Sequence, residues 1–252
     1  MTELLKNHPF AVEAFFKTSV VLTYAAPANQ LQSLIPECLM LDTFGDKAFV
    51  ALAMVQTREL RPKGFPRFMG NDFFLAGYRI FVRYVNAHGK RLRGLYILKS
   101  LTDKKKMELL GNTFTHYNYS QTDIGVEEGV QCQHFFSCGS GIDVTVEEGS
   151  DALALPSGSP FANWKEARRF AGPLPFTFTY NQQKREVLII EGVREDWTPQ
   201  PLFVKEANVE MPEILKGVDL TLANAFIVKN IPYCWKKGVK ELWKPTEEPY
   251  RA

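Results

Sequence analysis

The sequence predicts a β-rich α+β domain, built as a barrel or mixed sheet with a few short helices. Aromatic residues make up 13 % of the chain, with 19 Phe and 9 Tyr, and aromatic side chains favour strands and dense cores. Strand-like segments follow one another without the regular helices of a doubly wound fold. No Gly/Ser/Pro linker divides the 252 residues, so residues 1–252 are expected to form a single domain.

Charge and composition exclude several classes of partner. The 30 basic and 28 acidic residues give a net charge of +2, too balanced for a nucleic-acid-binding surface. The longest apolar run, Ala48–Val55, is far shorter than a membrane span. The sequence has no Gly-rich loop for a dinucleotide or phosphate, so no cofactor is expected. Four cysteines are too few for a disulfide framework, which predicts a reducing, cytoplasmic environment.

The clearest predicted strand is Phe73–Val85, in which apolar residues alternate. Tyr78 and Ile80 fall on one face, whereas Arg79 and Phe81 fall on the other. Further strands are predicted at residues 15–24, 39–41, 47–57, 94–98, 114–119, 130–137, 142–147, 176–180, 186–191, 202–211 and 220–229.

Three short helices are predicted among these strands. One begins at Thr102 or Asp103, which can cap it, runs through Leu110, and is closed by Gly111-Asn112. The other two are predicted at residues 28–34 and 164–170.

The cysteine- and histidine-containing segment Cys132-x-His134-x3-Cys138 has the composition of a metal site. On a strand, the even spacing would place all three side chains on one face. Zinc usually needs a fourth ligand at typical spacing, and none is nearby. We therefore predict a buried strand face here and no metal.

Three adjacent lysines, Lys104 to Lys106, leave a catalytic alternative open. Neighbouring ammonium groups depress each other's pKa, and a neutral amine can form an imine with a ketone. These lysines fall in the first turn of a predicted polar helix, where solvent screens them. A solvated charge run is therefore the simpler interpretation.

Four segments together carry a family resemblance: YAAPANQLQSLIP, LMLDTFGDKAFVALA, GYRIFVRYVNAHGKRLRGLYILKSLTD and ANWKEARRFAGP, beginning at Tyr24, Leu39, Gly77 and Ala162. The chain resembles the YqjF-like family of the acetoacetate decarboxylase-like superfamily, from near Phe15 to near Lys237. The resemblance implies a β-barrel-like α+β fold with a central cavity. In the decarboxylase branch it also implies a Schiff-base lysine beside a second lysine.

That catalytic pair is absent from the aligned position. The decarboxylase segment aligns with Gly111–Ser120, which places Tyr119 and Ser120 where the two lysines stand. Neither a phenol nor a hydroxyl can form an imine. Tyr117 and Tyr119 are similar to the Leu-Pro-Tyr-Tyr pattern of the YqjF-like family, with Asn118 in place of its proline.

An arginine of the family's Asn-Val-Arg motif is retained as Arg79, whereas Gly77 replaces the Asn. Leu75 stands where the resemblance would place a glutamate. Because a guanidinium can bind a carboxylate with two hydrogen bonds, Arg79 is the first candidate for a ligand-binding residue.

His116, Tyr117 and Tyr119 are the next candidates, because imidazole and phenol groups can orient or protonate a ligand. On the predicted strand, alternation allows one of two sets to face the cavity. One set is His116 with Asn118 and Ser120, and the other is Tyr117 with Tyr119.

The sequence thus predicts a protein that binds a small organic molecule bearing a carboxylate, without a Schiff-base lysine. Two alternatives stay open: a decarboxylase-type lyase that uses one of Lys104 to Lys106, and a non-catalytic structural or interaction protein filled by aromatic side chains. Exposed edges of the predicted sheet are compatible with a homodimer.

Overall fold

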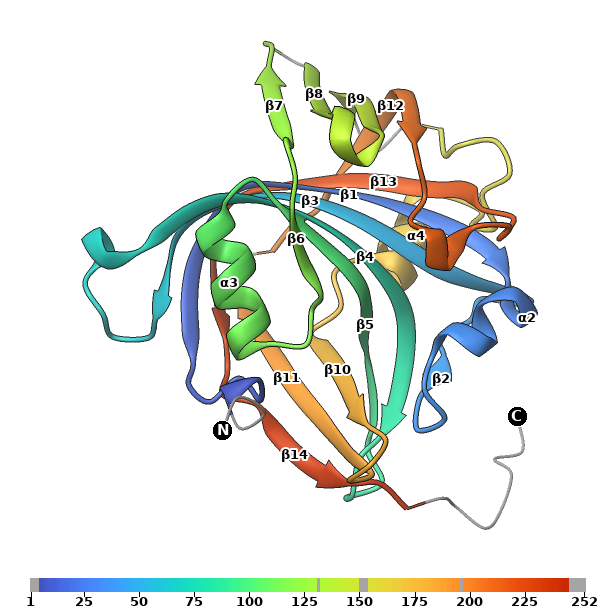
Figure 1. Cartoon of the computed structure of the whole chain (residues 1–252). Coiled ribbons are helices and arrows are strands. Elements are labelled where there is room, and N and C mark those ends of the chain that lie inside the picture. Colours follow the sequence, from blue (N-terminus) through green and yellow to red (C-terminus); the bar gives the residue numbers. More distant parts are fainter. Residues whose placement is uncertain (1–4, 131, 150–153, 195–196, 245–252) are drawn as a thin grey trace.

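The protein is described by a computed structural model that covers residues 5–130, 132–149, 154–194 and 197–244. In these residues one mixed sheet of fourteen strands is accompanied by three short α-helices (Figure 1). The β-rich mixed-sheet fold is therefore confirmed. The strands are β1 (Val12–Pro27), β2 (Met40–Leu41), β3 (Lys47–Pro62), β4 (Asn71–Val85), β5 (Arg91–Thr102), β6 (Tyr119–Gln121), β7 (Gly125–Glu128), β8 (Cys132–Ser137), β9 (Ile142–Glu148), β10 (Phe176–Asn181), β11 (Glu186–Arg194), β12 (Gln200–Val209), β13 (Thr221–Trp235) and β14 (Val239–Leu242). The helices are α2 (Ala28–Leu31), α3 (Lys105–Phe114) and α4 (Trp164–Ala171).

Seven of these strands close into a ring, in the order β11-β10-β5-β4-β3-β1-β13. The closing step is an antiparallel pairing of β11 with β13, which places Arg194 opposite Tyr233 and Gly192 opposite Trp235. A side chain at position 192 would overlap the Tyr233 hydroxyl, so a glycine is required at this closure. The ring brings together strands that lie far apart in the sequence.

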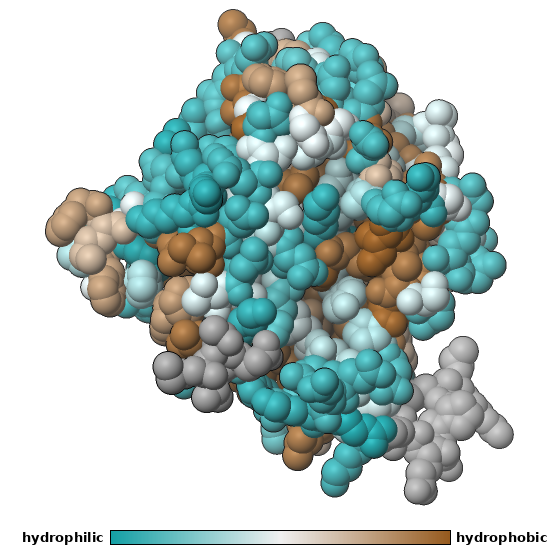
Figure 2. Space-filling view, in the orientation of Figure 1, coloured by the Kyte–Doolittle hydropathy of each residue, from teal (hydrophilic) through white to brown (hydrophobic). Residues whose placement is uncertain are grey.

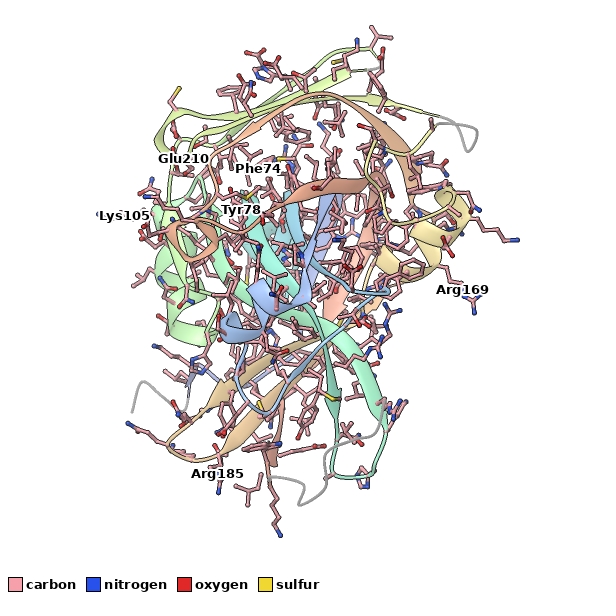
Figure 3. All side chains as sticks on the ribbon, turned by 90° about the vertical axis from the view of Figure 1, so that its right-hand side faces the viewer. Phe74, Tyr78, Lys105, Arg169, Arg185 and Glu210 are labelled. Carbon is pink, nitrogen blue, oxygen red and sulfur yellow. The ribbon has the colours of Figure 1, made fainter. Side chains whose placement is uncertain are left out.

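Alternation along β4 separates an outer core from an inner one, as its sequence predicts. Phe74 and Tyr78 belong to the outer cluster, which also contains side chains of β8, β9 and β12. Figures 1 and 3 show these strands lying across the outside of β13 and β1. Phe81 belongs to the inner cluster, and Arg79 shares its face of β4.

Helices α3 and α4 contribute to the inner cluster from different sides of the ring (Figure 1). Met107 of α3 is buried there, as are Trp164 and Ala167 of α4. At the start of α4, the Asn163 side chain accepts a hydrogen bond from the Glu166 amide, an ordinary N-terminal cap. The two helices therefore cover the interior of the ring.

Helix α3 differs from its prediction at both ends. Thr102 and Asp103 do not cap it: Lys104 is the N-cap and makes no side-chain capping bond. Asp103 instead accepts a hydrogen bond from the Phe74 amide at 2.7 Å. The helix continues through Gly111 to Phe114, so the predicted strand at 114–119 is wrong.

The connection between β3 and β4 carries the most exposed aromatic side chain of the described residues, Phe68, at 87 % exposure. Phe65 and Met69 are also exposed beside it. Figure 2 shows this apolar tip at the left edge, where Figure 1 draws the connection. The homodimer stays a prediction. An exposed apolar tip of this kind is the type of surface through which two copies could associate.

In the described part of the chain, no helix is both long and apolar enough to cross a membrane.

Candidate functional site

A cavity of about 110 Å³ lies inside the ring of seven strands. Its walls come from β1, β3, β4, β5, β6, β10, β11 and β13, together with the segment after α4. Most of the lining side chains are apolar or aromatic. The polar ones are Ser19, Arg79, Ser100, Tyr117, Tyr119, Thr177, Arg194, Trp197, Tyr233 and Trp235. The lining includes no lysine, histidine, cysteine or acidic residue among the described residues.

Arg79 reaches this cavity from the middle of β4. The pairing of β4 with β5 slips by one residue between Tyr78 and Arg79, and such β-bulges often re-aim a side chain next to a functional site. The guanidinium folds back over Gly77, with Nε 3.2 Å from where a Cβ at residue 77 would stand. The glycine that replaces the family's Asn therefore makes room for the arginine.

The charge of Arg79 has no carboxylate partner within the described part of the chain. Its Nε is buried and has no hydrogen-bond acceptor. The side chain is half-buried and lines the cavity. Burial lowers the pKa of Arg79, while the nearby phenols of Tyr119, Tyr233 and Tyr117 act in the opposite direction. Because an arginine side chain keeps its proton in proteins, the cavity holds an unneutralised cation.

Tyr117 and Tyr119 both line the cavity, Tyr117 from the bend after α3 and Tyr119 as the first residue of the short strand β6. Residues 115–118 bend between α3 and β6, with Asn118 in the left-handed region at φ 52°. The Asn112 side chain fixes the segment by accepting from the Tyr119 amide at 2.8 Å and donating to its carbonyl at 2.9 Å. The Tyr119 ring packs against Gly111, in the space that a Cβ would fill.

The tyrosines around Arg79 remain neutral hydrogen-bonding groups. Burial raises the pKa of Tyr119 to about 12 and also raises the pKa values of Tyr117 and Tyr233. The Tyr117 hydroxyl is buried and makes no hydrogen bond of acceptable geometry, although the Thr177 side chain lies close to it. Each phenol can donate one hydrogen bond to an oxygen atom in the cavity.

His116 does not line the central cavity. Its side chain borders a separate surface hollow together with Asn118 and residues of the β10–β11 hairpin. Arg79, Tyr117 and Tyr119 are thus brought together, whereas His116 lies apart from them. Their assignment as ligand-binding residues stays a prediction.

Three site residues were not predicted from the sequence: Arg194, Trp197 and Tyr233. Arg194 stacks over the Trp197 ring at 4.4 Å and donates to the Pro173 carbonyl at 2.7 Å. Its guanidinium is therefore already occupied, unlike that of Arg79. Tyr233 was missed because the last long strand was expected to end at Lys229, whereas β13 continues to Trp235.

The three lysines of the catalytic alternative are exposed and line none of the central cavity. Lys104 pairs with Asp103 at 3.4 Å, and Lys105 points away from the ring in Figure 3. The placement of these side chains gives no support to an imine mechanism.

The predicted buried face of Cys132, His134 and Cys138 is wrong. Cys138 lies in a short 3-10 turn after β8 and is exposed. His134 is half-buried and bonds Asp143 at 2.8 Å, a contact that raises the pKa of the imidazole. The described residues contain no cluster of three His, Cys, Asp or Glu side chains suited to a metal ion.

Replacing Gly77 with valine tests how Arg79 is positioned. The added side chain would meet the guanidinium, so we expect Arg79 to be displaced and ligand affinity to fall by about tenfold or more. Val85→Ala, at the half-buried end of β4, is the control. Equal ligand affinity of Gly77→Val and Val85→Ala in a calorimetric titration would contradict the positioning role.

Solved structures with similar folds are enzymes of low sequence identity. The enduracididine biosynthesis enzyme MppR complexed with pyruvate has a TM-score of 0.59 and 9 % identity, covering 92 % of this chain and 90 % of that one. Acetoacetate decarboxylase from Legionella pneumophila has a TM-score of 0.57 and 13 % identity, with 91 % and 86 % covered. An acetoacetate decarboxylase-like enzyme from Sphingomonas wittichii RW1 has a TM-score of 0.56 and 10 % identity, with 93 % of each chain covered. These likenesses establish the acetoacetate decarboxylase-like fold that the sequence resemblance implied.

No curated protein matches the chain. The family model DUF2071, described as an uncharacterized conserved protein (COG2071), matches residues 14–224, most of its length. The chain therefore belongs to the DUF2071 family.

Proposed function

We propose that this protein binds a small carboxylate in the central cavity, with Arg79 as the anion-binding residue. The observation that carries the proposal is the enclosed guanidinium, whose Nε has no acceptor and which lacks an acidic partner among the described cavity residues. A buried charge without a partner is costly. A bound carboxylate would neutralise it and accept two parallel hydrogen bonds.

The surrounding hydroxyl groups support the same ligand chemistry. Tyr117 has a buried hydroxyl that makes no hydrogen bond of acceptable geometry, and Tyr119 and Tyr233 lie close enough to Arg79 to raise its pKa. A neutral phenol donates to a carboxylate or to a carbonyl oxygen beside it. An oxo acid, which has both, would use the arginine and the tyrosines together.

The size of the cavity limits the part of the ligand that it can hold. A cavity of about 150 Å³ lined by apolar groups is large enough for benzene, so about 110 Å³ accommodates a few carbon and oxygen atoms. Pyruvate, bound by the similarly folded MppR, is of this class. The cavity also argues against a ring filled completely by aromatic side chains.

The composition of the lining favours non-covalent binding. Imine formation needs an amine beside the ligand, and no lysine is among the described residues that line this cavity. Borohydride reduction in the presence of pyruvate or acetoacetate tests this directly. We expect unmodified protein by mass spectrometry, whereas an adduct on Lys104, Lys105 or Lys106 would establish the decarboxylase-type alternative.

Binding itself is tested by calorimetric titration and thermal unfolding with pyruvate, with pyruvamide as the uncharged control. Because a ligand stabilises the folded state that binds it, pyruvate is expected to raise the melting temperature. Pyruvamide keeps the shape but lacks the charge, and we expect little effect from it. Equal responses to the two compounds would overturn the role of the guanidinium.

Carboxylate affinity is expected to be nearly constant between about pH 6 and pH 9. Arg79 stays protonated, and Tyr119, with its pKa raised to about 12, stays neutral over this range. Titrations at several pH values check this expectation. An affinity that changes by about tenfold across the range would indicate that another titrating group takes part.

A further inference from the structure

A second cavity, of about 290 Å³, lies between α3 and the ring. We name it the α3 chamber. Its floor is formed by Met107, Leu110 and Phe114 of the helix, and its other walls are mostly apolar. Those walls include Pro9, Phe10, Val12, Leu60, Phe73 and Leu75. Such a lining favours an apolar occupant.

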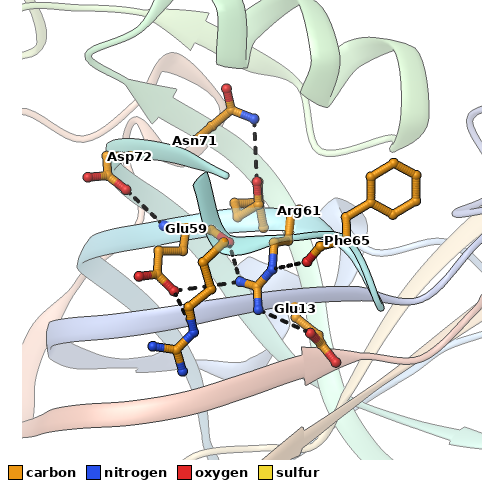
Figure 4. Close-up of polar contacts among 8 residues, drawn as sticks. Glu13, Glu59, Arg61, Phe65, Asn71 and Asp72 are labelled. Atoms are coloured by element: carbon orange, nitrogen blue, oxygen red, sulfur yellow. Dashed lines mark hydrogen bonds and ion pairs between the residues drawn. The ribbon is translucent and has the colours of Figure 1, made fainter. Parts of the chain in front are cut away.

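The charged side chain at the edge of this chamber is already neutralised. Arg61 donates to the carbonyls of Phe65 at 2.8 Å and Glu59 at 2.9 Å. It also pairs with Glu13 at 3.4 Å and with the Glu59 carboxylate at 3.7 Å (Figure 4). Among the described residues that line it, the α3 chamber therefore offers no free cation for an anionic group.

Two enclosed polar atoms of residues that line the chamber make no hydrogen bond. His8 is 6 % exposed, and its Nδ1 has no hydrogen-bond partner; burial lowers the pKa of this imidazole, which favours the neutral ring. The buried hydroxyl of Thr57 also has no partner. The apolar lining favours an apolar occupant, whereas these two atoms could pair only with a polar atom of a ligand.

The α3 chamber and the central cavity share a wall. Leu75, Tyr117, Tyr119 and Trp235 line both, so one layer of side chains separates them. Tyr117 lies in the bend between α3 and β6, and Tyr119 is the first residue of β6, so neither belongs to a strand of the ring. A shift of these rings would connect the two spaces.

We infer that the α3 chamber binds the apolar part of the ligand whose carboxylate binds at Arg79. The ligand class is then an amphiphilic carboxylate with an aliphatic chain or an apolar ring. This inference rests on the proposed function, because it takes the charged end of the ligand to be held in the central cavity.

A homologous series of acetate, butanoate, hexanoate and octanoate tests the inference by calorimetric titration. Each methylene that leaves water for an apolar chamber is expected to raise the affinity about fourfold. The chamber is filled in the variant Leu110→Trp, because Leu110 lines it. The matched control is Leu109→Trp on the same helix, where Leu109 is 69 % exposed.

We expect Leu110→Trp to bind acetate as the unmodified protein does and to lose the gain with chain length, while Leu109→Trp keeps it. If Leu110→Trp does not fold, Met107→Phe fills the same chamber. Short carboxylates that bind with no gain in affinity along the series would overturn this inference and leave the proposed function standing. Failure of every member to bind would overturn the proposed function as well.

Discussion

Replacing Arg79 with methionine is expected to remove carboxylate binding and to make the protein more stable. Loss of a charge-assisted bidentate contact lowers affinity by about 30-fold or more. The free energy of unfolding should rise by about 1–4 kcal/mol, because methionine fills the site without burying an unpaired charge. A residue retained for stability alone would show the opposite change in stability.

The same substitution at Arg169 is the control, because Arg169 lies on the exposed face of α4 and points to solvent in Figure 3. It should change neither pyruvate affinity nor the urea midpoint appreciably. An Arg79→Met variant that binds pyruvate as well as the unmodified protein does would contradict the proposed site.

Removing the Asp42 carboxylate, in Asp42→Ala, is expected to cost about 3–5 kcal/mol of unfolding free energy. Asp42 is fully buried and accepts from Arg83 Nε at 2.5 Å and from Arg93 Nε at 2.6 Å. These arginines stand directly opposite each other on β4 and β5, so without Asp42 two like charges face each other. Arg93 also donates to the Phe170 carbonyl of α4, so the loss would reach the helix that covers the ring.

Urea unfolding measures this cost against Asp46→Ala. Asp46 forms an ion pair with Lys47, and the Asp46 side chain is 82 % exposed. Such surface ion pairs contribute about 0–1 kcal/mol to the free energy of unfolding. A similar urea midpoint for the two variants would show that the contacts of Asp42 with Arg83 and Arg93 do not hold β4, β5 and α4 together.

Local patterns in the sequence predict the long strands well. In β4 the alternation of apolar residues identifies both faces, because one face packs in the outer core and the other faces the ring interior. The cavity-facing position of Arg79 follows from that alternation once the inner face is known. The sequence alone leaves open which face that is, because the ring closes through β11 and β13, strands that are far from β4 in the chain.

The region from Gly111 to Tyr119 shows why other predictions failed. A Gly-Asn pair resembles a helix C-terminus, yet here Gly111 lies within α3 because the Tyr119 ring occupies the space beside it. Asn112 bonds the Tyr119 backbone instead of ending the helix. These contacts depend on tertiary packing, so local propensity could not predict them. The strand predicted at residues 114–119 therefore assigned the wrong backbone conformation to His116 and Tyr117.

A crystal structure of the protein with pyruvate tests the central claim most directly. The account predicts a carboxylate in the cavity inside the ring, hydrogen-bonded to the Arg79 guanidinium, with a tyrosine hydroxyl on another ligand oxygen. Pyruvate bound elsewhere, or a cavity without pyruvate at a concentration that saturates binding in solution, would contradict it.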